Sequence, residues 1–280
     1  MTTALAPERA GTIEKSVSPP QAIRQTFTMT WRNLVQIKHN PMELIDLSIT
    51  PIMFVLLFSY VFGPAMAGSV SAYMPILIPG IIVQNALFAS MTTGIGLNTD
   101  VSKGVFDRFR SLPIARSAPL MGRIIADTGK QAWSMFIVLV IGLLIGFRIE
   151  TTWLALIPAF FLLLAFALLF SWVSVFVGLS VRDPEKVQIF GFVIIFPISF
   201  LSNAFIPVSD AYPGWIRTVM EANPVSHLAD ALRGLLVGHD VVNPAVGQPV
   251  LVPALWALAW GAVFAAIFVP LSMARFRKHS

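Results

Sequence analysis

The side chains that could catalyse a reaction are few and scattered along the chain. Asp127 with Lys130, and Asp183 with Glu185, are the only groupings that could place catalytic groups at a membrane interface. The second grouping contains Pro184 and is typical of a tight turn. The histidines follow no metal-binding spacing and are expected at surfaces or interfaces: His39, His227, His239 and His279. An integral membrane enzyme is therefore a remote alternative, and no metal site is expected.

The sequence contains no recognisable nucleotide-binding motif. A phosphate-binding loop reads G-x-x-x-x-G-K-[ST], but Ile124 stands where the first glycine is needed before Gly129-Lys130, and Gln131 follows the lysine. Gly94-Ile95-Gly96 does not complete a dinucleotide fingerprint, and helix packing explains it better. We therefore expect this chain to bind no cofactor of its own.

Composition indicates a membrane protein with several spans. The 280 residues are 56% hydrophobic and 12% charged, with a mean hydropathy of +0.77, whereas soluble domains carry about 25% charged residues. The absence of cysteine excludes disulfides and thiolate metal sites. The pI of about 9.9 is explained by basic residues on the inner side of a membrane, so no nucleic-acid partner is expected.

Stretches without ionisable residues predict an all-α fold with six transmembrane helices. Their approximate ranges are 44–63, 75–97, 131–147, 154–179, 188–206 and 251–272. Gly63-Pro64, followed by Ala67-Gly68-Ser69, separates the first two. With both termini in the cytoplasm, every Lys and Arg except Arg148, Arg217 and Arg233 lies on the inner side, as the positive-inside rule requires. Proton- or ion-driven carriers place charges inside their spans, and these six ranges contain none.

The segments before the first span and after the last are expected in the cytoplasm. Residues 1–20 lack the apolar region of a secretory signal and predict a disordered tail, and 275–280 form a basic tail. Residues 21–40 predict an amphipathic helix lying on the inner leaflet, with a solvated helix as the alternative. Its apolar positions are Ile23, Phe27, Trp31 and Leu34.

The largest cytoplasmic loop, 98–130, contains a segment with helical periodicity. Val105, Phe106, Phe109 and Leu112 follow the spacing i, i+1, i+4 and i+7, and Pro113 would end such a helix. Its apolar stripe predicts a docking surface for another protein. The alternative is a charged loop that only obeys the positive-inside rule.

Two short amphipathic helices are predicted in the outer segment between the fifth and sixth spans. The first contains Trp215 and Met220, Asn223-Pro224 ends it, and the second runs from about 225 to 236. Neither is long enough to cross a bilayer, so both are expected in or on the outer leaflet.

A few polar and small residues lie near the depth of the spans. Gln84, Asn85 and Asn203 could face a substrate path, although hydrogen bonding between helices is the usual role of such amides. Gly142 and Gly146 form a G-x-x-x-G pattern typical of close helix contact.

Several runs in the sequence resemble the permease subunits of type 2 ABC exporters, most closely the daunorubicin- and doxorubicin-resistance type of actinobacteria. The likeness covers nearly the whole chain after about residue 25. The runs are Tyr60-Val61-Phe62-Gly63, Leu77-Ile78-Pro79-Gly80-Ile81, Leu97-Asn98-Thr99-Asp100, Asp107-Arg108-Phe109-Arg110-Ser111-Leu112-Pro113-Ile114, Pro213-Gly214-Trp215 and Asn223-Pro224-Val225. Ser102 departs from the Glu that often precedes Gly104 by two residues in the wider superfamily, so a charge-dependent role there is not expected.

The resemblance implies that the first cytoplasmic loop contacts an ATPase subunit. The residues it assigns to this coupling contact are Lys103, Gly104, Val105, Phe106, Asp107, Arg108, Phe109, Arg110, Leu112 and Pro113. It further implies two copies of a separate ABC ATPase that binds ATP and Mg, and a second permease, either another copy or a homologue. The chain would reside in a bacterial plasma membrane.

The expected function is ATP-driven export of a hydrophobic drug or antibiotic, similar to daunorubicin. Uncharged spans favour such cargo, and the lack of a nucleotide site requires a partner. Export of a cell-envelope lipid or glycolipid is the alternative within the same class. A membrane enzyme and an ion-driven carrier are the remote alternatives from other classes.

Overall fold

The described part of the chain is helical, with turns and no strand, in agreement with the predicted all-α fold. A computed structural model describes residues 18–39, 41–105, 115, 118–238 and 249–279. The helices are α1 (Pro19–His39), α2 (Pro41–Leu57), α3 (Gly63–Ala67), α4 (Val70–Ser102), α6 (Ala118–Ile145), α7 (Leu156–Ser180), α8 (Pro184–Phe200), α9 (Gly214–Ala222), α10 (Pro224–Leu236) and α11 (Leu251–His279).

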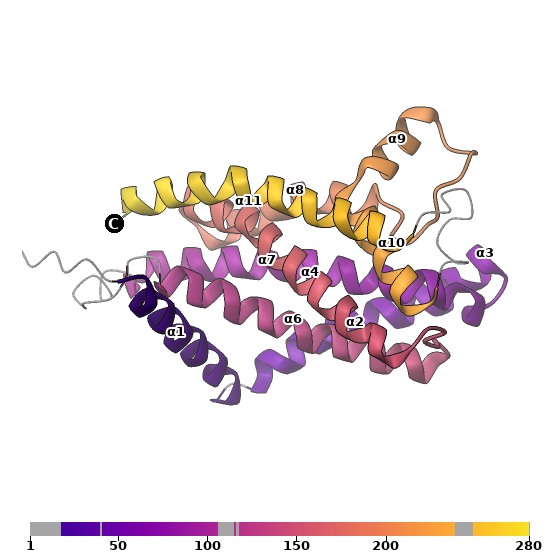
Figure 1. The fold of residues 1–280 in the computed structure, drawn as a ribbon, viewed down its shortest axis with the longest axis horizontal. Helices are drawn as coiled ribbons and strands as arrows, with labels where there is room; N and C mark the ends of the chain where they lie inside the picture. Colours follow the sequence, from indigo (N-terminus) through magenta and orange to yellow (C-terminus); the bar gives the residue numbers. More distant parts are fainter. Residues whose placement is uncertain (1–17, 40, 106–114, 116–117, 239–248, 280) are drawn as a thin grey trace, which may run out of the picture.

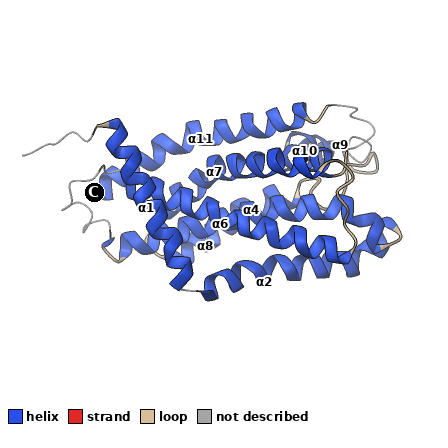
Figure 2. Cartoon of the chain, turned by 60° about the horizontal axis from the view of Figure 1, so that its bottom comes forward, coloured by secondary structure: helices blue, strands red, loops and turns tan. Residues whose placement is uncertain are grey.

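The long helices run along the long axis of an elongated bundle (Figure 1). Helix α1 and the C-terminal part of α11 lie at one end of this bundle, which we call the α1 end. Helices α9 and α10 lie at the opposite end, which we call the α9 end (Figures 1 and 2). The elements assigned from sequence to the inner side therefore gather at one end, and those assigned to the outer side gather at the other.

The break in the first apolar stretch lies at Gly68. Helix α2 passes through a π-helical turn, Phe58–Phe62, directly into α3. Pro64 is accommodated because it lies in the first turn of α3, where no backbone N–H needs an intrahelical partner. Gly68 then takes a left-handed conformation with a φ of 74°, and the Ser69 hydroxyl accepts a 3.2 Å hydrogen bond from the Ala72 N–H at the start of α4.

Helix α4 is the central element, because it packs against α6, α7, α8 and α10 and most of its side chains are buried. It crosses α7 at two glycines. A Cβ on Gly94 would lie 2.4 Å from the Ser174 carbonyl oxygen, and one on Gly178 would lie 2.4 Å from the Gly94 carbonyl oxygen. The packing role expected for Gly94 is confirmed.

Polar side chains fix the same crossing. The hydroxyls of Ser90 and Ser174 lie 3.3 Å apart. The Asn98 amide donates to the carbonyl oxygens of Gly178 and Val181, at 2.9 and 2.6 Å. These acceptors lie at the carboxyl end of α7, where backbone carbonyls lack helical partners. Asn98 thus ties the end of α7 to α4.

Only one of the two glycines in the G-x-x-x-G pattern packs closely against another helix. Gly142 does pack closely, since a Cβ there would lie 2.8 Å from the Ile78 Cδ1 atom of α4. Gly146 lies beyond the end of α6 with a φ of 130°, and nothing lies within 4 Å of a Cβ built on it. Gly146 therefore serves the turn that ends the helix.

Within the described part of the chain, five helical segments are long and apolar enough to cross a membrane: Leu47–Ala67, Val70–Ser102, Ala118–Ile145, Trp153–Ser180 and Leu251–Phe276. The third begins at Ala118, whereas the sequence places its start near 131, so three charged residues belong to its first turns. The predicted range 188–206 overlaps α8, which begins at Pro184, ends at Phe200 and has 17 residues. The helix does not continue beyond Phe200 because the next residue, Leu201, has a ψ of 43°, which departs from helical geometry.

The two short helices predicted at 214–236 are present as α9 and α10. Asn223 separates them: its side chain accepts a 2.8 Å hydrogen bond from the Val225 N–H, which caps α10. The Asn223 amide also donates to the carbonyl oxygens of Ile198 and Leu201, both at 2.7 Å. One side chain therefore starts α10 and ties it to the end of α8, while α10 itself packs against α11, α4 and α7.

Candidate coupling site

The loop expected to contact an ATPase leaves α4 at the α1 end of the bundle. Gly104 ends the helix with a φ of 66°, a left-handed conformation that favours glycine. The Lys103 N–H donates to the Thr99 carbonyl and the Gly104 N–H to the Val101 carbonyl, both at 3.0 Å. Lys103 is exposed and Val105 is half-buried. The other predicted coupling residues lie outside the described part of the chain: Phe106, Asp107, Arg108, Phe109, Arg110, Leu112 and Pro113.

A cluster of four charged side chains lies at the base of this loop. Arg123 of α6 forms an ion pair with Asp100 near the end of α4. The Arg123 Nε atom also lies 3.5 Å from an Asp127 carboxylate oxygen, close enough for an ion pair although not aligned for a hydrogen bond. The other Asp127 oxygen lies 3.0 Å from the Lys130 ammonium. Each charge in the cluster therefore has a partner of opposite sign.

The sequence reasoning missed this cluster. The sequence suggests Asp127 and Lys130 only as a remote catalytic pair, and it places Arg123 and Lys130 among the basic residues of the inner side. The spacing of Arg123, Asp127 and Lys130 at i, i+4 and i+7 indicates a charged face on a helix, but it does not reveal the contact with Asp100. Because Asp127 lies between two cations, the geometry favours a structural ion-pair cluster over a catalytic pair.

Gly96 makes room for the Arg123 guanidinium against α4. A Cβ on Gly96 would lie 1.8 Å from Nη2 and 2.6 Å from Cζ of Arg123. The guanidinium thus lies directly over the α4 backbone, one turn before Asp100. Any side chain at position 96 would displace it.

Helix α1 packs on the first turns of α6 beside this cluster. A Cβ on Gly122 would lie 2.6 Å from the Met29 Cβ and 3.0 Å from the Thr30 backbone nitrogen, so the two helices meet with little between them. The Gln25 side-chain oxygen accepts a 2.8 Å hydrogen bond from the Ala115 N–H, just before α6 begins. Helix α1 therefore holds the far end of the loop.

The predicted apolar positions of α1 divide between two environments. Ile23, Phe27 and Trp31 are 60, 67 and 70% exposed. Leu34 is half-buried, with its Cδ2 atom 3.7 Å from a Cβ built on Gly129 of α6. Three of the four positions thus form an exposed apolar face, and the fourth faces the bundle.

The polar residues expected along a substrate path lie in different surroundings. Gln84 is buried, and among the described residues the nitrogen of its side-chain amide has no hydrogen-bond partner. The same holds for the amide nitrogen of the half-buried Asn85. Asn203 lies at the α9 end, where its amide nitrogen donates to both carboxylate oxygens of Asp230 at 2.8 Å. Its backbone N–H donates to the Ser226 hydroxyl at 3.0 Å. The polar groups of Asn203 are thus used within the chain.

Arg233 is the centre of that polar network, although it is 3% exposed. Its guanidinium donates to the carbonyl oxygens of Ile76, Asn203 and Ala204 at 3.1, 2.7 and 2.9 Å, and to Asp230 at 3.1 Å. Burial lowers the pKa of the Arg233 guanidinium, and the Asp230 carboxylate opposes that shift. Three segments distant in sequence, α4, the turn after α8 and α10, are joined by this one side chain.

Phenylalanines form a continuous series of ring contacts near the same end. On α8, Phe192, Phe196 and Phe200 stack at one-turn spacing, with centroid distances of 5.0 and 4.3 Å. The series continues through Phe205 to Phe58 of the π-helical turn, at 5.5 and 4.7 Å. The three α8 rings are exposed and give the surface an aromatic stripe without charge, whereas Phe205 is buried.

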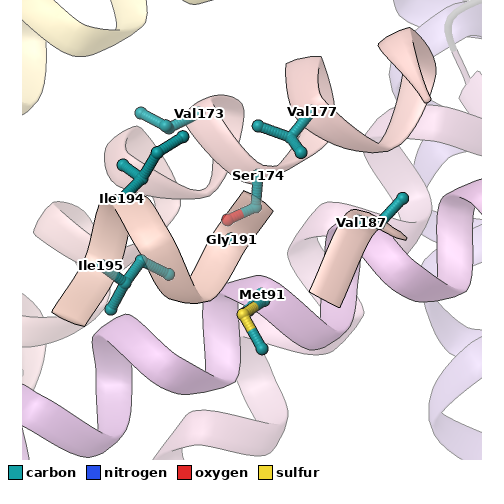
Figure 3. A pocket seen from close by; sticks show the side chains of 8 residues that line it. All are labelled: Met91, Val173, Ser174, Val177, Val187, Gly191, Ile194 and Ile195. Atoms are coloured by element: carbon teal, nitrogen blue, oxygen red, sulfur yellow. The ribbon is translucent and has the colours of Figure 1, made fainter. Parts of the chain in front are cut away.

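A small hollow lies between α4, α7 and α8 (Figure 3). Its lining is apolar except for the Ser174 hydroxyl: Met91, Val173, Ser174, Val177, Val187, Gly191, Ile194 and Ile195. The hollow has room for about one water molecule, whereas drug-sized ligands occupy pockets of about 300–1,000 Å³. This hollow therefore does not hold a drug-sized molecule.

Comparison with known proteins identifies the family. Residues 24–237 match the model of the ABC-2 type transporter family. The chain is 34% identical over 261 residues to the daunorubicin resistance ABC transporter permease protein DrrB1 of Streptomyces coeruleorubidus, covering 92% of this chain and 87% of the relative. It is 26% identical over 237 residues to the probable doxorubicin resistance ABC transporter permease protein DrrC of Mycobacterium tuberculosis, covering 81% and 82%.

A more distant relative comes from outside the drug-resistance group. The putative transport permease ycf38 of Cyanophora paradoxa is 24% identical over 219 residues, covering 76% of this chain and 74% of the relative. The family match spans more than half of the chain and includes the loop, the charged cluster and the Arg233 network. The chain therefore belongs to the ABC-2 type transporter family of membrane permeases.

Proposed function

We propose that this chain is the permease subunit of an ATP-driven exporter that moves a hydrophobic drug or antibiotic, of the daunorubicin kind, out of the cell. The observation that carries the proposal is the likeness to a daunorubicin resistance permease over 92% of this chain and 87% of the relative. Because the likeness extends over nearly the whole of both chains, the same arrangement of spans and loops is expected in both.

The energy for export comes from a separate ABC ATPase, present in two copies, that binds ATP and Mg. The loop that begins at Lys103 is its docking site, together with α1. The geometry supports this assignment because the loop leaves the bundle at the same end as α1, and Gln25 of α1 bonds to Ala115 at the loop's far end. The Ile23, Phe27 and Trp31 face of α1 is exposed and lies in the inner leaflet interface.

The permease has six spans, with α8 as the fifth and both termini in the cytoplasm. A 17-residue helix is about 26 Å long, which is just short of a bilayer core of about 30 Å. The turn that follows α8 extends it toward the outer interface. Support comes from Ile189, Phe190 and Val193, which are large apolar residues exposed on α8 as they would be beside lipid or a second subunit.

The cargo passes between this permease and a second one, either another copy or a homologue. Two observations favour this route: the hollow between α4, α7 and α8 is far too small for a drug, and the surface row of phenylalanines on α8 is uncharged. Export of a cell-envelope lipid or glycolipid is the second candidate, because the same apolar surface suits acyl chains.

Gentle purification from a bacterial membrane tests the proposal. The tagged chain should retain an ABC ATPase, and vesicles containing the complex should accumulate daunorubicin in an ATP-dependent manner when the inner face points outward. Recovery of the chain without an ATPase would contradict the exporter mechanism. ATP-dependent movement of a fluorescent phospholipid, without movement of daunorubicin, would establish the lipid alternative.

A further inference from the structure

We propose that Asp100 and Arg123 form a clamp that transmits the movement of the ATPase-bound loop to the transmembrane helices. Neither residue is needed to bind the ATPase; both are positioning residues that couple its movement to α4 and α6. This inference rests on the proposed function, because it assigns a role within the coupling site described above.

The clamp closes the loop at its base. Asp100 lies two residues before α4 ends, and Arg123 lies in the second turn of α6. Their ion pair joins the end of the helix that precedes the loop to the start of the helix that follows it. A force applied to that segment therefore reaches α4 and α6 through one shared contact, rather than bending either helix end alone.

The surrounding charges hold the Arg123 side chain in one position. Asp127, whose side chain is 9% exposed, lies one turn after Arg123 on the same helix, and Lys130 binds the opposite oxygen of Asp127. The guanidinium also rests on the α4 backbone at Gly96. A side chain held on three sides transmits displacement better than a freely rotating surface pair.

Helix α1 is connected to the same place. It meets α6 at Gly122, the residue before Arg123, and it bonds to the loop through Gln25 and Ala115. The clamp thus lies where α1, α4 and α6 converge. Movement of the loop against the clamp would shift all three helices as one unit.

The clamp is not required to hold α4 and α6 together. The two helices also pack along the bundle, with Gly142 against Ile78 far from the charged end. Loss of the ion pair should therefore leave the folded bundle and the docking loop in place while the loop moves independently of α4. This distinguishes a clamp from a general stabilising contact.

Three variants test the clamp in different ways. Asp100→Asn and Arg123→Gln each remove one charge with little change in size. Gly96→Ala leaves both charges intact, but its new Cβ would lie 1.8 Å from the guanidinium, so the flexible end of Arg123 must move. Because alanine favours helix more than glycine does, the last variant weakens the pair without weakening α4.

Each variant is purified with its ATPase, and three quantities are measured: the ATPase retained per permease, the rate of ATP hydrolysis, and the daunorubicin exported per ATP hydrolysed. Coupling between distant sites is typically worth 5- to 150-fold, so we expect export per ATP to fall about tenfold in all three variants. ATPase retention and hydrolysis should be unchanged. The double variant Asp100→Asn/Arg123→Gln should lose no more than the worse single one, because both act through one contact.

Two controls lie at the same end of the bundle. Gly129→Ala is a glycine substitution on α6 whose new Cβ would meet only Leu34, at an ordinary distance of 3.7 Å. Lys186→Gln removes an exposed ion pair with Asp183 before α8. Both should export as the wild type does. Arg123→Lys keeps the charge with a shorter reach, and we expect it to restore part of the coupling if Arg123→Gln proves too unstable to purify.

Other results would overturn the clamp. Unchanged export per ATP in all three variants would overturn the clamp. Loss of the retained ATPase would also overturn it, because the ion pair would then shape the docking surface. If the wild-type chain itself retains no ATPase or exports nothing, the proposed function fails instead. The two failures are therefore distinguishable before any variant is made.

Discussion

The crossing of α4 and α7 gives the sharpest prediction about stability. Gly94→Ala places a Cβ 2.4 Å from the Ser174 carbonyl oxygen, which must retreat by about 1 Å to reach ordinary contact, because that begins near 3.4 Å. Both atoms belong to helix backbones or lie next to them, so no flexible side chain can absorb the shift. The helices must separate along this part of their length.

The expected cost follows from the contacts that separation disturbs. Overpacking a tight interior costs about 1–3 kcal/mol. The hydrogen bonds of Ser90 and Asn98 across the same crossing stretch as well, and each such bond between membrane helices is worth about 0.6 kcal/mol. We therefore expect a loss of about 2–4 kcal/mol, which corresponds to a fall of roughly 5–15 °C in the apparent Tm.

Thermal unfolding of the detergent-solubilised chain, followed by size-exclusion chromatography, measures this effect. Gly178→Ala should produce a similar fall, since its Cβ would lie 2.4 Å from the Gly94 carbonyl oxygen. The double variant should fall by less than the sum, because one separation relieves both clashes. Gly129→Ala is the matched control and should keep the wild-type Tm. An apparent Tm for Gly94→Ala equal to that of the control would refute the glycine crossing.

Three further predictions concern other parts of the chain. Arg233→Gln should destabilise the fold by about 3–5 kcal/mol, because it removes the cationic partner of Asp230 and the guanidinium N–H groups that three carbonyl oxygens accept. Limited proteolysis between α8 and α10 should accelerate, and protection equal to the wild type would contradict this prediction. Burial lowers the pKa of His227 from 6.5, with Asp230 opposing, so the unfolded chain binds the proton more tightly and stability should fall as the pH drops below about 6.5. His227→Phe should lose that part of the acid sensitivity while keeping the ring stacked on Trp256, which thermal unfolding at neutral and acid pH measures; an identical pH dependence in both chains would exclude His227. Finally, because the chain contains no cysteine, the single variants Trp31→Cys and Thr28→Cys can each be labelled in vesicles with a water-soluble maleimide. If the exposed apolar face of α1 lies in the membrane, position 31 should be protected from the label and position 28 should be labelled. Equal labelling of both positions would place that face in water.

The elements of the fold were predictable because each depends on a local stretch of sequence. Apolar stretches of sufficient length indicated the long helices, and Asn223-Pro224 correctly divided α9 from α10. Helix ends were predicted less well where a helix continues past the apolar core. The predicted start of α6 near 131 is too late, because Arg123, Asp127 and Lys130 pair with one another and with Asp100 and can therefore lie on the helix.

The sequence by itself determined that this protein is a helical membrane permease and that it carries no recognisable nucleotide-binding motif, because length, hydropathy and motifs are properties of contiguous residues. Only the tertiary structure decided which residues meet. Asp100 lies opposite Arg123, Gly94 opposite Gly178, and Arg233 against Ile76, although nothing in the local sequence of these residues indicates which partner each one meets. The physical reason is that the hydrophobic effect selects segments for the membrane by their overall composition, whereas contacts between helices depend on close approach and hydrogen bonding between particular atoms far apart in the chain.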